Sequence, residues 1–278
     1  MYTIKAEQQQ TIIHLLVEGN SIRSVERLTG VHRDTIMRLM VKVGNKCRDF
    51  LDAKLRGLKL RHIQCDEIWT FVGKKQSKIE ADIIRDPSIG DQYLYVAFDT
   101  DTKLIATYAT GKRTSEITAA FIDDLAGRIV SEYPQLSTDG FAPYVATIKE
   151  SFGEEAAHGV LIKDYAKREY DQPGRYGPPP MIGSHRTQVR GLKDIDLKTI
   201  CTSHVERNNL TIRTFIKRFA RLSLGFSKKL ENLAAAVALH VAYYNFCRVH
   251  GSLGVTPAME AGLVGEAWEL ADLLVAIE

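Results

Sequence analysis

The sequence predicts an α/β protein in which an all-α N-terminal segment precedes a mixed β-sheet covered by helices. Three observations predict this class. The first 61 residues have only helix-like apolar spacing, the run from His62 to Val72 is rich in β-branched and aromatic residues, and helix-like and strand-like runs alternate after Ser115. A chain of 278 residues has room for a catalytic core and one small appended domain.

Three short helices are predicted in the N-terminal segment, and glycine or polar residues separate them. Their expected ranges are Glu7–Glu18, Ser21–Leu28 and His32–Val43. A shared apolar core is expected from Ile22, Val25, Leu28, Val31, Ile36 and Leu39. This arrangement predicts a helix-turn-helix DNA-binding domain over residues 1–45, followed by a helical linker over residues 46–61 that is broken at Gly57.

The helix-turn-helix pattern nominates individual DNA contacts. The start of its second helix normally faces base edges in the major groove, which here selects Arg33, Asp34, Thr35 and Arg38. Arg23 and Arg27 on the preceding helix are predicted to contact phosphates, which set the register of the protein without reading sequence. A helical hairpin used only for dimerisation is the alternative.

The predicted strands and helices of the core follow a definite order. The run His62–Val72 is the first strand, and a polar turn at residues 99–103 joins the next two into a hairpin. The later elements are the strands Tyr93–Phe98 and Leu104–Tyr108, the helix Ser115–Val130, the strand Gln135–Asp139, the helix Ala142–Phe152 and the strand His158–Ile162. Three antiparallel strands followed by alternating helices and strands predict a ribonuclease H-like core with a five-stranded mixed sheet, over residues 62–262.

Residues 166–199 are predicted to be a loop insertion in this core. Pro173 and Pro178–Pro180, together with several glycines, argue against regular structure over most of the segment. A loop of this length in a compact domain is either functional or disordered. After the core, residues 263–278 are expected to form a C-terminal helix.

Three carboxylates form a candidate metal site. Asp66 and Asp139 lie in or just after strand-like runs, and Glu206 begins a helix whose N-cap is Thr202 or Ser203. Strand alternation sends Glu67 to the face opposite Asp66. Helical spacing places Asn209, Arg213 and Lys217 on the face of Glu206, and all three are predicted to contact DNA there. With 34 acidic residues in the chain, the spacing of the three carboxylates carries little weight without its context.

Charge is distributed unevenly along the chain. Residues 1–61 hold 12 Lys and Arg against 6 Asp and Glu, and residues 166–229 hold 14 against 5. Residues 62–165 between them hold 10 against 17. Two basic segments on either side of an acidic segment suit a protein that binds a polyanion at two places. The carboxylates of the acidic segment are then available to bind cations. Solvated helix faces are the alternative reading of the same charges.

Several segments resemble the insertion sequence one family of DDE transposases, of the ribonuclease H-like integrase superfamily. The similar segments are Cys65-Asp66-Glu67-Ile68-Trp69-Thr70-Phe71-Val72, Thr138-Asp139-Gly140, Ser203-His204-Val205-Glu206-Arg207-Asn208-Asn209-Leu210-Thr211, and the tail from Tyr244 to Ala258. Relatives often carry an N-terminal zinc ribbon, whereas here Cys47, Cys65, Cys201 and Cys247 include no pair at metal-ligand spacing.

The resemblance implies a transposase that binds the terminal inverted repeats of an insertion sequence, then cleaves and transfers DNA strands. It implies two Mg²⁺ ions, which Mn²⁺ can replace, with Asp66 bridging both, Asp139 on one and Glu206 on the other. A basic residue seven positions after the glutamate fits the family pattern, so Arg213 is expected near a phosphate beside the scissile bond. Terminal-repeat and target DNA, and a homo-oligomer on DNA, are the implied partners.

Two other functions remain open at this point. One is a helix-turn-helix DNA-binding regulator with a catalytically inactive or ligand-sensing α/β domain, and the other is a metal-dependent nuclease without strand transfer. The scattered cysteines, the polar N-terminus and the lack of an apolar run of about 18 residues predict a cytoplasmic protein without a membrane segment.

Overall fold

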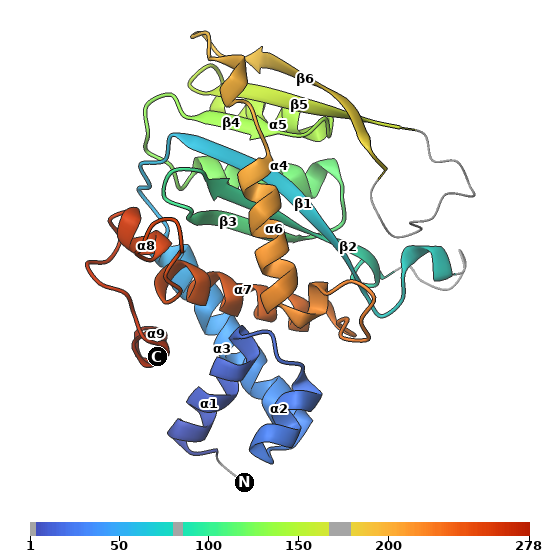
Figure 1. Ribbon diagram of the computed structural model, residues 1–278, viewed down its shortest axis with the longest axis vertical. Coiled ribbons are helices and arrows are strands. Elements are labelled where there is room, and N and C mark those ends of the chain that lie inside the picture. Colours follow the sequence, from blue (N-terminus) through green and yellow to red (C-terminus); the bar gives the residue numbers. More distant parts are fainter. Residues whose placement is uncertain (1–3, 80–85, 167–178) are drawn as a thin grey trace.

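The computed structural model describes residues 4–79, 86–166 and 179–278, and within them the fold is mixed α/β around one sheet (Figure 1). The sheet has six strands in the order β3-β2-β1-β4-β5-β6. These are β1 His62–Val72, β2 Gly90–Asp99, β3 Ile105–Gly111, β4 Gln135–Thr138, β5 Ala157–Tyr165 and β6 Met181–Arg190. Strands β1, β2 and β3 are antiparallel neighbours, β1, β4 and β5 are parallel, and β6 returns antiparallel to β5.

The expected first five strands and the β2–β3 hairpin are confirmed, but the five-strand count is wrong. The extra strand, β6, lies inside the segment predicted as a loop, and it pairs with a β5 that continues to Tyr165. The prolines that argued for a loop precede β6, and most of its side chains are exposed, so it carries no apolar alternation. Part of the predicted loop, residues 167–178, falls outside the described residues.

Helices cover the two faces of the sheet differently. Helices α4 (Ser115–Ala126) and α5 (Pro143–Phe152) pack together behind the sheet in Figure 1, whereas α6 (Ser203–Phe215) crosses in front of β1. Helix α4 is shorter than expected because it ends at Gly127. Alternation along β1 divides its side chains between these layers, so neighbouring residues in sequence face different helices.

The N-terminal residues form three helices, α1 (Ala6–Val17), α2 (Ile22–Thr29) and α3 (Arg33–Lys54). Ser21 caps α2 by accepting a hydrogen bond from the Ser24 main chain, and Gly30 ends it at a φ of 70°. The core of this unit includes Val25 and Ile36, both fully buried. The expected core position of Leu28 is wrong, because its side chain is 66% exposed.

Helix α3 joins the N-terminal unit to the rest of the molecule. It continues without interruption through residues 46–54 and packs against α7 (Leu230–Phe246). At the crossing, a Cβ on Gly44 would lie 2.2 Å from the carbonyl oxygen of Ala235, so the two helix backbones nearly touch. The first half of the expected linker is therefore helical, with only Cys47 and Leu51 buried in residues 46–54, and the chain leaves the helix only after Lys54.

The C-terminal region is less helical than expected. Residues 263–278 contain only the short α9 (Leu270–Ala276), which follows α8 (Pro257–Glu260). Trp268 lies before α9 and packs against the rings of Phe50 and Phe246 at tilted angles. Among the helices of the described ranges, none combines the length and apolar character that a membrane crossing requires.

Candidate metal centre

Asp66 and Asp139 meet where the pairing of the parallel strands β1 and β4 stops, with Asp66 in the middle of β1 and Asp139 just after the end of β4. Strand β4 ends at Thr138, and its pairing with β1 stops at Gln64 and Ser137, just before the two aspartates. Carboxylate oxygens of Asp66, Glu67 and Asp139 lie within 4.8 Å of one another. The sheet therefore brings together two residues that are 73 positions apart in sequence.

Glu67 joins this group from the other face of β1. The Asp66 carboxylate points to α6, where Asn209 donates a 2.7 Å hydrogen bond to it. Glu67 lies on the α5 side beside Tyr144, and its side chain is only 3% exposed. Alternation is thus confirmed, and the Glu67 carboxylate nevertheless lies close to those of Asp66 and Asp139. Because the central strand β4 ends at Thr138, Asp139 lies just beyond the end of that strand, where it meets carboxylates from both faces of β1.

The electrostatics of the group favour a cation. Burial, followed by repulsion from Glu67, Asp139 and Glu206, raises the pKa of Asp66 to about 7, although a main-chain hydrogen bond opposes the shift. Burial also raises the pKa of Glu67. Carboxylate oxygens are the ligands that Mg²⁺ and Mn²⁺ prefer, so this donor set fits a divalent ion.

Arg113 is a residue of the centre that sequence reasoning missed. Its Nε donates to Glu67 Oε2 at 3.2 Å, and a terminal nitrogen lies 3.6 Å from Asp139. The guanidinium stacks 3.8 Å from the centre of the Phe141 ring. The Phe141 main chain in turn donates to Asp139 Oδ1 at 2.9 Å. The only signal for Arg113 in the sequence is that a basic residue follows a predicted strand. That signal does not reveal the carboxylates that Arg113 contacts.

Glu206 lies beside the group of three rather than within it. Its Oε1 accepts a 2.5 Å hydrogen bond from the Thr202 hydroxyl and also contacts the ammonium group of Lys163 on β5. The Glu206 side chain is 45% exposed. It is close enough to raise the pKa of Asp66, so the structure brings the third predicted carboxylate near Asp66.

The position of α6 depends on a second missed residue, Gln64. Its side-chain oxygen accepts hydrogen bonds of 3.0 Å from the main chains of both His204 and Val205, and its amide donates to Cys201 Sγ. The N-cap residue, Thr202, makes no side-chain cap of its own. Gln64 and Asp66 share one face of β1, so the strand holds the start of α6 and its second turn together.

The other residues predicted around Glu206 have separate outcomes. Asn209 contacts Asp66, as described above. Arg213 is half-buried and donates to the Phe219 main chain at 3.1 Å; burial lowers its pKa, and nearby Asp66 opposes that shift. The placement of Lys217 on the α6 face is wrong, because α6 ends at Phe215 with extended backbone at residue 216. Lys217 instead begins the short helix η3 (Lys217–Phe219) and is exposed.

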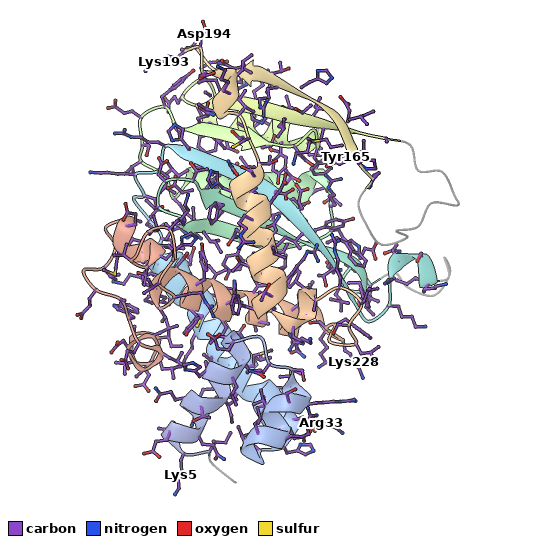
Figure 2. All side chains as sticks on the ribbon, in the orientation of Figure 1. Lys5, Arg33, Tyr165, Lys193, Asp194 and Lys228 are labelled. Carbon is purple, nitrogen blue, oxygen red and sulfur yellow. The ribbon has the colours of Figure 1, made fainter. Side chains whose placement is uncertain are left out.

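The predicted DNA contacts of the N-terminal unit lie far from the carboxylates. Figure 2 shows Arg33 at the end of the molecule opposite the sheet. Exposed side chains in this unit include Arg23, Arg27, Arg33, Asp34 and Arg38, and Thr35 is partly exposed. The Arg33 main chain donates to Glu26 at 2.9 Å, which fixes the start of α3 against α2.

Comparison with known proteins finds a transposase family in the second half of the chain. Residues 181–246, which include β6, α6 and α7, match the family model for IS1 transposase. No curated protein matches the chain. Among solved structures, a piggyBac transposase synaptic complex with hairpin DNA aligns with 100% of this chain and 72% of that chain, at 12% identity and a TM-score of 0.40. The resemblance to the IS1 transposases is therefore confirmed over residues 181–246.

Proposed function

We propose that this protein is a DDE transposase that binds the terminal inverted repeats of an insertion sequence, then cleaves and transfers DNA strands. The observation that carries the proposal is the convergence of Asp66 and Asp139, contributed by neighbouring parallel strands, against a helix of the segment that matches IS1 transposase. The strand order, with an antiparallel hairpin followed by parallel strands, supports a ribonuclease H-like core over residues 62–262.

Asp66, Asp139 and Glu206 are the proposed catalytic and metal-binding residues. Two divalent cations bound there, Mg²⁺ or Mn²⁺, would supply activation of the nucleophile and stabilisation of the entering and leaving oxygens. Asn209 orients the Asp66 carboxylate through its hydrogen bond, and Gln64 fixes the helix that carries both Asn209 and Glu206. Arg213, near Asp66, is the proposed contact to a phosphate beside the scissile bond. Lys217 is a proposed DNA contact from η3 rather than from α6.

Helices α1–α3 are the proposed helix-turn-helix unit for duplex DNA. Support comes from the exposed arginines at the start of α3 and on α2, and from the excess of basic residues over residues 1–61. Arg33, Asp34, Thr35 and Arg38 are the proposed base contacts, and Arg23 and Arg27 the proposed phosphate contacts. Since α3 is buried against α7, this unit is best tested in the full chain. Assembly of several copies on DNA belongs to the same proposal.

The experiment that tests the function is a strand-cleavage and joining assay on the element's own DNA ends. The full-length protein is incubated with labelled end DNA and Mg²⁺, and products are sequenced for wild type, Asp66→Asn and Arg33→Ala. Wild type should nick and join ends, Asp66→Asn should bind DNA without cutting, and Arg33→Ala should lose about 1–3 kcal/mol of sequence preference. Cutting by Asp66→Asn at the wild-type rate would remove the DDE assignment. Cleavage without any joined product would identify a nuclease instead.

A further inference from the structure

Two leucines on the segment that follows α6 are almost fully exposed. This segment, the basic loop (residues 217–229), begins with η3 and ends where α7 starts. Leu222 is 82% exposed and Leu224 is 93% exposed, and these are the two largest exposed fractions among the large apolar side chains of the described residues. Both side chains therefore contribute little to the core of the free protein.

The tip of the basic loop has an unfavourable backbone conformation. Leu222 has a φ of 54°, in the left-handed region that a bulky side chain rarely adopts. The Ser223 hydroxyl accepts a 3.1 Å hydrogen bond from the Gly225 main chain, and a Cβ on Gly225 would lie 3.0 Å from the carbonyl oxygen of Lys217. The loop thus turns back tightly on its own start. Strained positions of this kind occur most often where a segment is held ready for binding or catalysis.

The second half of the basic loop is fixed to strand β1. The Gly73 main chain donates to the Ser227 carbonyl oxygen at 2.9 Å, just after β1 ends. The ring of Phe226 lies 4.7 Å from the ring of Phe71. The exposed leucines therefore stand on a base that is bound to the sheet, so their position is set before any partner arrives.

The basic loop lies between the two parts of the molecule that are proposed to bind DNA. The Arg218 guanidinium contacts the sulfur of Met40 on α3 at 3.3 Å. Arg213, the proposed contact to the phosphate beside the scissile bond, donates to the main chain of η3. Figure 2 shows Lys228 between the sheet and Arg33. A duplex that reaches from the start of α3 to the carboxylates therefore passes close to this loop.

The charge of the basic loop favours a polyanion as its partner. Residues 217–229 include five basic residues and no acidic residue. The exposed basic side chains of the loop and of the neighbouring β1–β2 connection are Lys217, Arg221, Lys228, Lys229, Lys74, Lys75 and Lys78. Lys229 pairs with Glu231 at 3.4 Å. Within the described residues, Lys217, Arg221 and Lys228 form no ion pair. Exposed leucines among such cations suit DNA, which offers phosphates to the cations and base steps to the apolar side chains.

We propose that the basic loop lies on the DNA duplex and inserts Leu222 and Leu224 between base pairs. This inference rests on the proposed function and adds an element that distorts the bound DNA. Apolar side chains that enter a base step unstack its base pairs and kink the duplex. The basic side chains of the loop bind the flanking phosphates, so the leucines supply the distortion and the cations supply affinity.

The test maps unstacked bases in DNA bound by the full-length protein. A labelled duplex of the element's end is mixed with protein in EDTA, so that no strand is cut. Permanganate and diethyl pyrocarbonate then modify unstacked thymines and purines. Wild type should make one base step hyperreactive. The double variant Leu222→Ala, Leu224→Ala should still retard the duplex in a gel, but the bases should react as in free DNA.

Two control proteins accompany the double alanine variant. The double variant Leu222→Met, Leu224→Met keeps long apolar side chains and should retain the wild-type reactivity. Val275→Ala shortens an exposed apolar side chain on α9, in a region with one basic and six acidic residues over positions 230–278, and should behave as wild type.

Arg221→Ala tests the role of the cations. It should keep the hyperreactive step while lowering the slope of log affinity against log salt by about 0.9, the contribution of one phosphate contact. An unchanged slope would contradict the placement of the loop on DNA.

The remaining outcomes separate this inference from the proposed function. If wild type binds no duplex at any salt concentration, the proposed function itself is wrong. If wild type binds the duplex without a hyperreactive base, or if the double alanine variant keeps the hyperreactive step, only the insertion of the leucines is overturned. The same holds if that variant instead dissociates a DNA-free oligomer in sedimentation, because the leucines would then join copies of the protein.

Discussion

The strand-borne carboxylates and the helix-borne carboxylate of the candidate centre are held in different ways. Asp66 and Glu67 are set by main-chain hydrogen bonds of β1 to β2, and Asp139 by its place at the end of β4. Glu206 stands on the first turn of a helix, is 45% exposed, and is held mainly by side chains. The comparison teaches that the main-chain bonds of the sheet fix the strand-borne carboxylates, whereas the position of the partly exposed Glu206 carboxylate depends on side-chain contacts.

The largest expected effect tests whether the strand-borne and the helix-borne carboxylates are both needed for DNA strand cleavage. Asp139→Asn and Glu206→Gln should each lower the strand-cleavage rate by about a thousandfold or more, equivalent to about 4 kcal/mol of activation free energy. The reason is that each removes a proposed metal-binding carboxylate. Single-turnover cleavage of end DNA is the measurement, with DNA binding as the control for folding. Near-normal cleavage by Glu206→Gln would restrict the catalytic centre to the strands.

The second effect concerns how the strand-borne carboxylate Asp66 makes the free energy of unfolding depend on pH. The folded-state pKa of Asp66, about 7, lies above its ordinary 3.8, so ionising it destabilises the fold. The stabilisation that protonated Asp66 gives the folded state is fully present below pH 3.8 and is lost as pH rises through about 7. At pH 8, Asp66→Asn should therefore be more stable than wild type, on the order of 2–4 kcal/mol, and the two unfolding curves should converge by pH 4.

Denaturant unfolding of both proteins at several pH values measures this difference, and titrating groups distant from Asp66 cancel because they are common to both. Metal-free buffer with a chelator keeps the carboxylates unliganded. A stability difference that does not change between pH 4 and pH 8 would mean that Asp66 is not strained by its neighbours.

A smaller effect is expected at Gln64, which joins strand β1 to the start of helix α6. Gln64→Ala removes the acceptor for the His204 and Val205 main chains, which should lower the free energy of unfolding by about 1–3 kcal/mol and reduce cleavage because α6 loses its anchor. Gln135→Ala is a matched control on β4, since that buried glutamine pairs with Thr199 and not with α6. Equal loss of cleavage in both variants would show that Gln64 has no special role in placing α6.

The smallest effect is expected at the ion pair between Lys163 and the helix-borne carboxylate Glu206. Lys163→Met should lower the free energy of unfolding by no more than about 1 kcal/mol, because the Glu206 carboxylate is substantially exposed. Thermal unfolding at low and high salt is the measurement, with Lys163→Arg as the charge-preserving control. A loss of several kcal/mol would mean that Glu206 is fixed as firmly as the strand carboxylates.

Local patterns were sufficient for much of the framework. Alternation and helical spacing predicted strands β1–β5, the three N-terminal helices and the place of Glu206 in the first turn of α6. They failed for β6, whose exposed side chains show no apolar alternation, and for Lys217, because nothing local indicated that α6 stops at Phe215. Patterns of this kind report which side chains share a face, since burial repeats with the period of the element.

The sequence by itself determined the order of elements and the nomination of Asp66, Asp139 and Glu206. Only the tertiary structure decided that Glu67 and Arg113 enter the centre and that Lys163 holds Glu206. The physical reason is distance. A face is a local property of a strand or helix, but a contact within 4.8 Å depends on where neighbouring strands end and on which elements pack across them.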